Sequence, residues 1–266
     1  MLDTNMFATR EMCFQPCPAS SLGLVGVLGG MGPLATVDFM RKLLHATPAR
    51  NDQDHVPVLV SSIPQIPDRT QAFRGEGESP IFALTDCALR LRVAGASLIV
   101  MPCNTAHLWF DDVQAGVNLP MLHIVDAAIE DALALAGPDA QIGLLATDAT
   151  IASGLYINRM PLSTTEQSFQ WLLPTANEML EWVMPGVAAV KSGDIKKGTQ
   201  LLLAAASALQ QRGAKALVLG CTEIPVVLNE RNSPVPSVDA TLALARRTVQ
   251  WSMAQRGLVS PTTKLT

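Results

Sequence analysis

The sequence predicts an α/β fold made of two pseudo-symmetric lobes, each with a mostly parallel sheet flanked by helices. From Leu22 onward, short runs of aliphatic and β-branched residues alternate with longer amphipathic stretches of helical length, an alternation typical of α/β proteins. Several short runs are apolar almost throughout, as in parallel strands that are covered on both faces. An internal repeat of nearly half the chain indicates the second lobe.

The expected strands are the short runs that end in Gly, Pro or Asn. They cover residues 24–29, 58–62, 98–101, 121–124, 142–146, 171–173 and 216–219, with a short one near Val235. The expected helices cover residues 35–46, 81–94, 126–135, 176–191, 195–211 and 239–256. Helices between strands are the usual crossover connection of a parallel sheet.

Two pairs of segments repeat at almost the same distance along the chain. Residues 26–29 (GVLG) resemble residues 143–146 (GLLA), 117 positions later, and the segments that contain Cys103 and Cys221 match with those cysteines 118 positions apart. Each cysteine follows the carboxyl end of an expected strand, where open α/β sheets bind ligands. Lobes that face each other would therefore hold both thiols in one cleft. Coincidence among Leu- and Val-rich strands is the alternative interpretation.

Composition excludes several classes of protein. With 266 residues the chain can bury a full hydrophobic core without disulfides or metals. Charged residues make up only 16%, and the net charge of −4 is spread along the chain, so no nucleic-acid partner is expected. The apolar segments are shorter than the roughly 20 residues of a membrane span, so no membrane association is expected either.

The five cysteines are an odd and sparse set, which favours reduced thiols and a cytoplasmic location over a disulfide framework. Residues 1–21 lack the continuous apolar stretch of a secretory signal, and we interpret them as a flexible N-terminal extension. Cys13 and Cys17 have the spacing of half a zinc site, but no second Cys or His pair follows nearby. No metal site is therefore expected.

Cys103 and Cys221 are the candidate catalytic residues. Small polar residues and backbone N–H groups surround each of them, a setting that can lower the pKa of a thiol, especially where a helix begins. Most buried cysteines are inert packing, and we keep that interpretation for Cys87. Inverting a carbon stereocentre requires removal of a proton from one face and its return on the other, which a thiolate and a thiol on opposite sides can do without a cofactor.

Residues 29–35 (GGMGPLA) follow a strand and open a helix. They loosely match a dinucleotide-binding fingerprint, but the next strand ends in Ser61-Ser62-Ile63-Pro64, without the acidic residue of an NAD site. We expect the glycines to bring the backbone close to a small anion such as a carboxylate. A purely structural turn is the alternative.

A proline-rich loop, residues 64–70, places Arg69 at the same sheet edge as the first cysteine. Arginine suits bidentate binding of a carboxylate, and a solvated surface arginine is the alternative. His107 lies one helical turn after Cys103, so we expect it to support the structure rather than activate the thiol.

Seven segments together resemble the aspartate/glutamate racemase superfamily, and within it the aspartate racemases most closely. They are residues 29–36 (GGMGPLAT), 52–55 (DQDH), 64–70 (PQIPDRT), 101–107 (MPCNTAH), 143–147 (GLLAT), 190–193 (VKSG) and 220–223 (GCTE). The resemblance extends from Leu22 to about Trp251.

The resemblance implies a role for each matching residue. Cys103 and Cys221 match the family's paired acid/base thiols, and Arg69 and Lys191 match two cations around the substrate. The other expected substrate contacts are Met31, Asn104, Thr105, Ala106, Thr147 and Thr222. The resemblance further implies that no pyridoxal phosphate or metal is needed and that the protein forms a homodimer. It places the site in the cleft between a first lobe, residues 22–119 plus 234–266, and a second lobe, residues 120–233.

The function that follows is the interconversion of L- and D-aspartate. Two fixed cations match the two carboxylates of an acidic amino acid, whereas a neutral substrate would leave one cation unpaired. Glutamate is one methylene longer, a difference worth about 1–3 kcal/mol, so a glutamate or broad-specificity racemase stays an alternative.

Other functions on the same scaffold are a related isomerase, a hydantoin racemase or a decarboxylase, and family members that decarboxylate need only one cysteine. A non-catalytic binding protein and a thiol redox protein are further alternatives. The cysteines and cations count against the first of these, and the lack of a C-x-x-C motif counts against the second.

Overall fold

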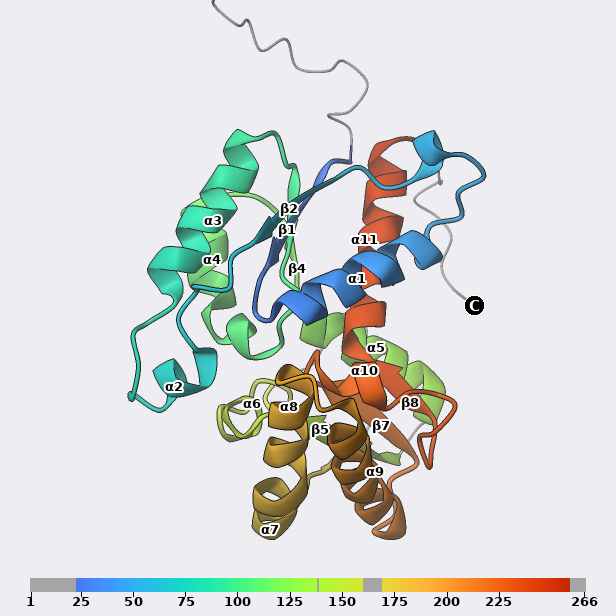
Figure 1. Ribbon diagram of the computed structural model, residues 1–266. Helices are drawn as coiled ribbons and strands as arrows, with labels where there is room; N and C mark the ends of the chain where they lie inside the picture. The colour runs from blue at the N-terminus through green and yellow to red at the C-terminus, as the bar shows by residue number, and fades with distance from the viewer. Residues whose placement is uncertain (1–22, 138, 160–168, 259–266) are drawn as a thin grey trace, which may run out of the picture.

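The computed structural model describes residues 23–137, 139–159 and 169–258, and these form two lobes (Figure 1). The sheet of the first lobe has the strand order β2-β1-β3-β4, and that of the second has the order β6-β5-β7-β8. Every neighbouring pair of strands in both sheets is parallel. The identical strand order confirms the predicted fold class of two pseudo-symmetric α/β lobes.

The strands are β1 (Val25–Gly29), β2 (Val58–Ser62), β3 (Leu98–Val100), β4 (Met121–Leu122), β5 (Ala140–Ala146), β6 (Phe169–Leu172), β7 (Ala216–Gly220) and β8 (Ser237–Asp239). The helices are α1 (Pro33–Ala46), α2 (Arg69–Phe73), α3 (Ile81–Val93), α4 (Phe110–Val117), α5 (Ile124–Ala136), α6 (Asp148–Ala152), α7 (Ala176–Glu178), α8 (Met184–Lys191), α9 (Ile195–Gln211), α10 (Ile224–Val227) and α11 (Ala240–Gln255). Short 3-10 helices lie at Asp52–Asp54 and Thr105–Trp109.

The sequence-based expectation misses the helices α2, α4, α6 and α10, which are too short for a clear apolar period. The long helix expected over residues 176–191 is instead α7, a π-helical turn at Met179–Val183, and α8. Pro185 lies in the first turn of α8. Proline has no N–H to donate, and its ring clashes with the preceding helical turn, which accounts for the wider turn just before it.

Helices cover both faces of each sheet (Figure 1). In the first lobe, α3 and α4 pack on one face, while α1 and α11 cover the other. In the second lobe, α8 and α9 pack on one face and α5 on the other. The central strands β1, β3 and β7 are therefore buried along their whole length, which explains why they are apolar throughout.

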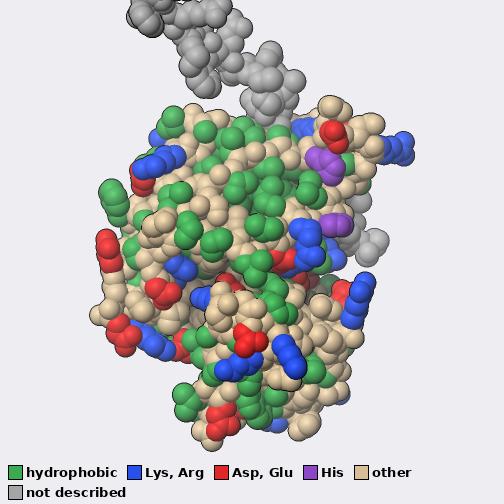
Figure 2. Space-filling model, in the orientation of Figure 1, with side chains coloured by type: hydrophobic (Ala, Val, Ile, Leu, Met, Phe, Trp, Pro, Cys, Tyr) green, Lys and Arg blue, Asp and Glu red, His purple; other side chains and the backbone are tan. Residues whose placement is uncertain are grey.

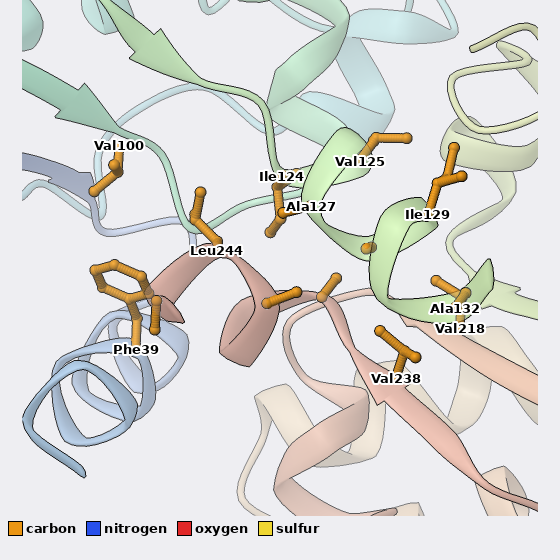
Figure 3. Close-up of a cluster of buried hydrophobic side chains, with 14 of the residues drawn as sticks. Phe39, Val100, Ile124, Val125, Ala127, Ile129, Ala132, Val218, Val238 and Leu244 are labelled. Atoms are coloured by element: carbon orange, nitrogen blue, oxygen red, sulfur yellow. The ribbon is translucent and has the colours of Figure 1, made fainter. Parts of the chain in front are cut away.

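Two helices cross from one lobe to the other. Helix α5 follows β4 of the first sheet and packs against β7 of the second, and α11 follows β8 of the second sheet and packs against α1 of the first. Their buried side chains join one core that runs through both lobes, with Phe39 of α1 and Val238 of β8 in the same cluster (Figure 3). Each fully buried side chain of this kind contributes roughly 1.5–3 kcal/mol, so this core holds the lobes together.

The two crossings show where the chain passes from one sheet to the other. Strand β4 still pairs with β3 in the first sheet, and β8 still pairs with β7 in the second. The chain therefore leaves the first sheet after Leu122 and the second after Asp239, a few residues beyond the expected divisions at 119/120 and 233/234. The lobe boundaries at 119/120 and 233/234 stay predictions. Residues 1–21, which we interpret as an N-terminal extension, lie outside the described residues.

Basic and acidic side chains are interspersed on the face shown in Figure 2. Apolar side chains gather there over β2 and α1, where Val37 is 66% exposed and Val60 is 45% exposed. Within the described residues, no helix is both long and apolar enough to cross a membrane. The homodimer and the cytoplasmic location stay predictions.

Candidate active site

Cys103 and Cys221 lie at equivalent places in the two lobes. Cys221 directly follows β7, and Cys103 follows β3 after Met101 and Pro102. Both thiols are buried, at 6% and 5% exposure, and both line one cavity between the lobes. The cavity is lined by Met31, Asp68, Arg69, Thr70, Cys103, Asn104, Thr105, Thr147, Lys191, Cys221, Thr222 and Glu223. The structure thus brings together every expected site residue except Ala106.

Ala106 acts on the site through its backbone. Its side chain is fully buried and does not line the cavity, but its N–H group faces the thiol of Cys103. His107, the next residue, is held in place by the backbone on both sides of its ring. Its Nδ1 lies 2.8 Å from the carbonyl oxygen of Cys103, and its Nε2 accepts from the N–H of Ile124. Burial lowers the pKa of His107 to about 4, so a neutral, structural histidine fits this position.

The second thiol has a carboxylate partner. The Sγ of Cys221 donates to Oε2 of Glu223 across 3.0 Å, and the Thr222 hydroxyl lies 3.4 Å from the same oxygen. Glu223 is only 5% exposed, and a carboxylate so deeply buried is uncommon unless it is paired. A Cβ added at Gly32 would lie 3.8 Å from Oε1 of Glu223, so the glycine turn lies beside this carboxylate.

The two thiols have unequal surroundings. Burial raises the pKa of Cys103, while the Arg69 guanidinium and the N–H of Ala106 act in the opposite direction. Burial also raises the pKa of Cys221, to well above its ordinary value, and the Glu223 carboxylate adds to this rise, with Lys191 opposing it in part. Charge and hydrogen bonding therefore favour the thiolate more at Cys103 than at Cys221.

A helix start positions Arg69. The side chain of Asp68 caps α2 by accepting from the N–H groups of Thr70 and Gln71, both at 2.9 Å, which is why the proline-rich loop ends here. Arg69 then turns back on the loop, and its Nη1 donates to the carbonyl oxygens of Ile66 and Pro67. The other N–H groups of the guanidinium stay available to bind a ligand at the cavity wall.

Lys191 is the last residue of α8 and lines the cavity from the second lobe. The helix stops because Gly193 adopts a left-handed conformation, with φ of 85°, just past its end. Burial acts to lower the pKa of Lys191, but Glu223 and the two nearby thiols outweigh it and raise the pKa. Neither Lys191 nor Arg69 forms an ion pair within the described part of the chain.

Hydroxyl groups link the lobes beside the cysteines. The Oγ1 of Thr105 lies 3.0 Å from those of both Thr147 and Thr150, and Thr147 also caps α6. An ion pair between Arg74, at the end of α2, and Asp148, at the start of α6, joins the lobes nearby. These contacts join the two lobes beside the cavity.

The glycine segment is largely explained by packing. A Cβ on Gly30, whose φ is 94°, would lie within 2.4 Å of the backbone of Ile63, and a Cβ on Gly29 would overlap Thr36. The Oγ1 of Thr36 accepts from the Gly30 N–H and donates to the Gly32 carbonyl. The structural turn thus accounts for Gly29 and Gly30, while Met31 alone of this segment lines the cavity.

Reasoning from single residues missed three members of the cavity, Asp68, Thr70 and Glu223. Asp68 stands before a short helix in the position of an N-cap, which was a usable signal. Glu223 lies two positions after a strand-end cysteine, but the sequence does not tell whether such a residue points inward. Among the described residues, no group of three or more His, Cys, Asp or Glu side chains could hold a metal ion.

The chain is similar to known racemases over most of its length. It is 30% identical to the solved aspartate racemase of Picrophilus torridus, with a TM-score of 0.76 over 88% of this chain and 98% of that one. It is 28% identical to a broad-specificity amino-acid racemase of Bacillus subtilis (strain 168), over 87% of this chain and 99% of the relative. A glutamate racemase of Francisella tularensis, 18% identical with a TM-score of 0.62, shares the fold.

The family model described as Asp/Glu/Hydantoin racemase matches residues 28–248. This range covers most of both lobes and every residue that lines the cavity. The chain therefore belongs to the Asp/Glu/Hydantoin racemase family and is an enzyme of the isomerase class, as its sequence predicts.

Proposed function

We propose that the protein interconverts L- and D-aspartate by transferring a proton between two thiols and the α-carbon. The observation that carries the proposal is that Cys103 and Cys221 reach one cavity from equivalent strand ends of opposite lobes. A substrate bound between them would present one face of its α-carbon to each sulfur. This is the arrangement that inversion by two acid/base groups requires.

In the proposed reaction the thiolate of Cys103 removes the α-proton, and the thiol of Cys221 delivers its proton to the opposite face. The surroundings of the thiols support this assignment in the free enzyme: burial raises the pKa of both, but Arg69 and the Ala106 N–H oppose the rise at Cys103, so a thiolate forms more easily there than at Cys221. The bond to Glu223 favours the protonated form at Cys221. The roles exchange for the other enantiomer.

Electrostatic help comes from the walls of the cavity. The α-hydrogen of an amino acid is a weak acid, so the carbanion needs preorganised positive charge and hydrogen-bond donors in a site closed to water. Arg69 and Lys191 are the available cations. Asn104, Thr105 and Thr222 add polar groups close to the cysteines, and we assign them to the α-carboxylate and amino group.

The same cations support an acidic substrate. Both are without an ion-pair partner within the described residues, and a second carboxylate on the substrate would neutralise them. The similarity to an aspartate racemase over most of both chains supports aspartate. Broad specificity is the second candidate, because the relative from Bacillus subtilis has that name.

The test is to incubate the purified protein with L-aspartate in deuterated water without pyridoxal phosphate. Loss of the α-hydrogen by proton NMR, together with decay of optical rotation to zero, is expected. Absence of exchange with aspartate, glutamate and neutral amino acids alike would overturn the racemase proposal. Exchange with neutral amino acids at rates equal to that of aspartate would establish the broad-specificity candidate instead.

Two variants test the mechanism. Cys103→Ser and Cys221→Ser should each abolish racemisation, because a hydroxyl is far too weak an acid to replace a thiol as the proton-transfer group. Cys87→Ser is the matched control, since Cys87 is buried in α3 away from the cavity, and it should racemise normally. Normal turnover by either active-site variant would eliminate the two-thiol mechanism.

A further inference from the structure

Tyr156, which follows α6, connects the core of the second lobe to the candidate site. It is the only tyrosine in the chain, and its side chain is fully buried. Its hydroxyl donates to Oδ1 of Asn104, in the first lobe, at 2.5 Å. Asn104 lies next to Cys103 and lines the cavity, whereas Tyr156 does not. Tyr156 therefore contacts a residue of the cavity wall through its bond to Asn104.

The bond determines which end of the amide is free. An asparagine side chain has an acceptor end and a donor end, and the phenol occupies the acceptor end. Nδ2 of Asn104 is buried and has no hydrogen-bond partner, although the residue is only 2% exposed. A buried donor without a partner is destabilising, and on a side chain that lines a binding cavity it indicates a donor kept for a ligand.

The phenol can fill this role because it stays protonated. Burial raises the pKa of Tyr156, and a negative charge on the nearby Cys221 would raise it further. A hydroxyl that does not ionise must find an acceptor when it is buried. The reverse orientation of the amide would present N–H groups to the phenol and remove that acceptor, so the two groups fix each other's orientation.

We infer that Tyr156 is a positioning residue that turns the N–H donors of Asn104 toward the cavity, where they bind a carboxylate of the substrate. The inference rests on the proposed function for the identity of that carboxylate. Because Tyr156 and Asn104 belong to different lobes, the bond that orients the donors joins the two lobes.

The test is a double-mutant cycle of Tyr156→Phe and Asn104→Ala. Tyr156→Phe removes only the hydroxyl and keeps the ring that packs edge-on against Trp171. It should raise the KM for the racemised amino acid about tenfold, the loss expected for one hydrogen bond to a charged group, with a smaller change in kcat. In the Asn104→Ala background, Tyr156→Phe should have no further effect on KM. Independent, additive effects would overturn the inference.

Thr248→Val is the matched control for loss of a buried hydroxyl. Thr248 lies in α11, is fully buried and donates to the Leu244 carbonyl at 2.7 Å. This variant should lower the unfolding temperature and leave KM unchanged. If Tyr156→Phe behaves in the same way, its role is only structural and the inference fails.

A readout that needs no turnover separates this inference from the proposed function. In the 15N-labelled free protein, the side-chain NH2 signals of Asn104 are identified by their loss in Asn104→Ala. Tyr156→Phe should shift these signals and broaden them as the amide becomes free to rotate, and Thr248→Val should not. Unchanged signals would overturn the inference even if aspartate is racemised, whereas altered signals without racemisation would overturn only the proposed function.

Discussion

Glu223→Gln should make the thiol of Cys221 ionise more easily. The wild-type carboxylate accepts a hydrogen bond from Sγ at 3.0 Å, so it stabilises the thiol and repels the thiolate. Glutamine keeps the size and an acceptor oxygen but removes the charge. The result should be a lower pKa of Cys221 and a larger thiolate fraction at every pH below it.

The distance sets the size of the effect. Two negative charges 3.0 Å apart repel each other by roughly 5 kcal/mol at an effective dielectric constant of about 20. Lys191 offsets part of this repulsion. If only about 1.4 kcal/mol of it remains, the thiolate fraction of Cys221 in the variant still rises about tenfold.

The assay is alkylation by iodoacetamide, read at each cysteine by peptide mass spectrometry. Only the thiolate reacts, so the rate at Cys221 should rise about tenfold at neutral pH, and that at Cys103 should change much less. Asp68→Asn is the matched control, because it removes a carboxylate from the same cavity that has no bond to either thiol. An unchanged or lower rate at Cys221 in Glu223→Gln would refute the reasoning.

Three further changes give distinct results. Arg69→Ala or Lys191→Ala should lower kcat/KM for aspartate about 10- to 100-fold, from the loss of one charged hydrogen bond. The kcat/KM for alanine, measured in the same substrate panel, should fall only slightly. Equal losses for both amino acids would contradict an acidic substrate. Arg74→Ala should raise KM no more than about fivefold, because its ion pair with Asp148 is partly exposed. In steady-state kinetics, adding Asp148→Asn to this variant should not raise KM further. Since burial lowers the pKa of His107 from 6.5 to about 4, its neutral form stabilises the fold fully above pH 6.5. The free energy of unfolding should fall by about 3 kcal/mol from this group as the pH falls to 4. In urea titrations, the free energy of unfolding of His107→Gln should decline less steeply with falling pH.

The sequence was sufficient for the architecture because the architecture depends on patterns that extend over many residues. Apolar strands and amphipathic helices of ten or more residues keep their period, and their predicted ranges agree with the structure within a few residues. The repeat that relates Cys103 to Cys221 also follows from the chain alone. The pattern of strands and helices and the internal repeat together determine which strand ends face the cavity.

Local geometry was harder to predict. Helix α2 has five residues, too few to show a period, yet it determines where Arg69 points. Lys191 could not be distinguished from the nearby Lys196 and Lys197 without the resemblance, because nothing in the sequence shows which of the three lines the cavity. Tyr156 lies 52 positions from its partner Asn104, and no spacing along the chain indicates a contact of that kind.

The unequal thiols must also satisfy a thermodynamic constraint. L- and D-aspartate have equal free energies in water, so kcat/KM has to be the same for both enantiomers at every pH. The Glu223 carboxylate beside Cys221 and the Arg69 guanidinium near Cys103 therefore cannot favour one direction of the reaction. They can only divide the same kcat/KM differently between kcat and KM, because each enantiomer binds a different protonation state of the thiol pair. Glu223→Gln should consequently bring the two KM values closer together while the ratio of the two kcat/KM values stays at one. KM values that stay as far apart as in the wild type would contradict this reasoning.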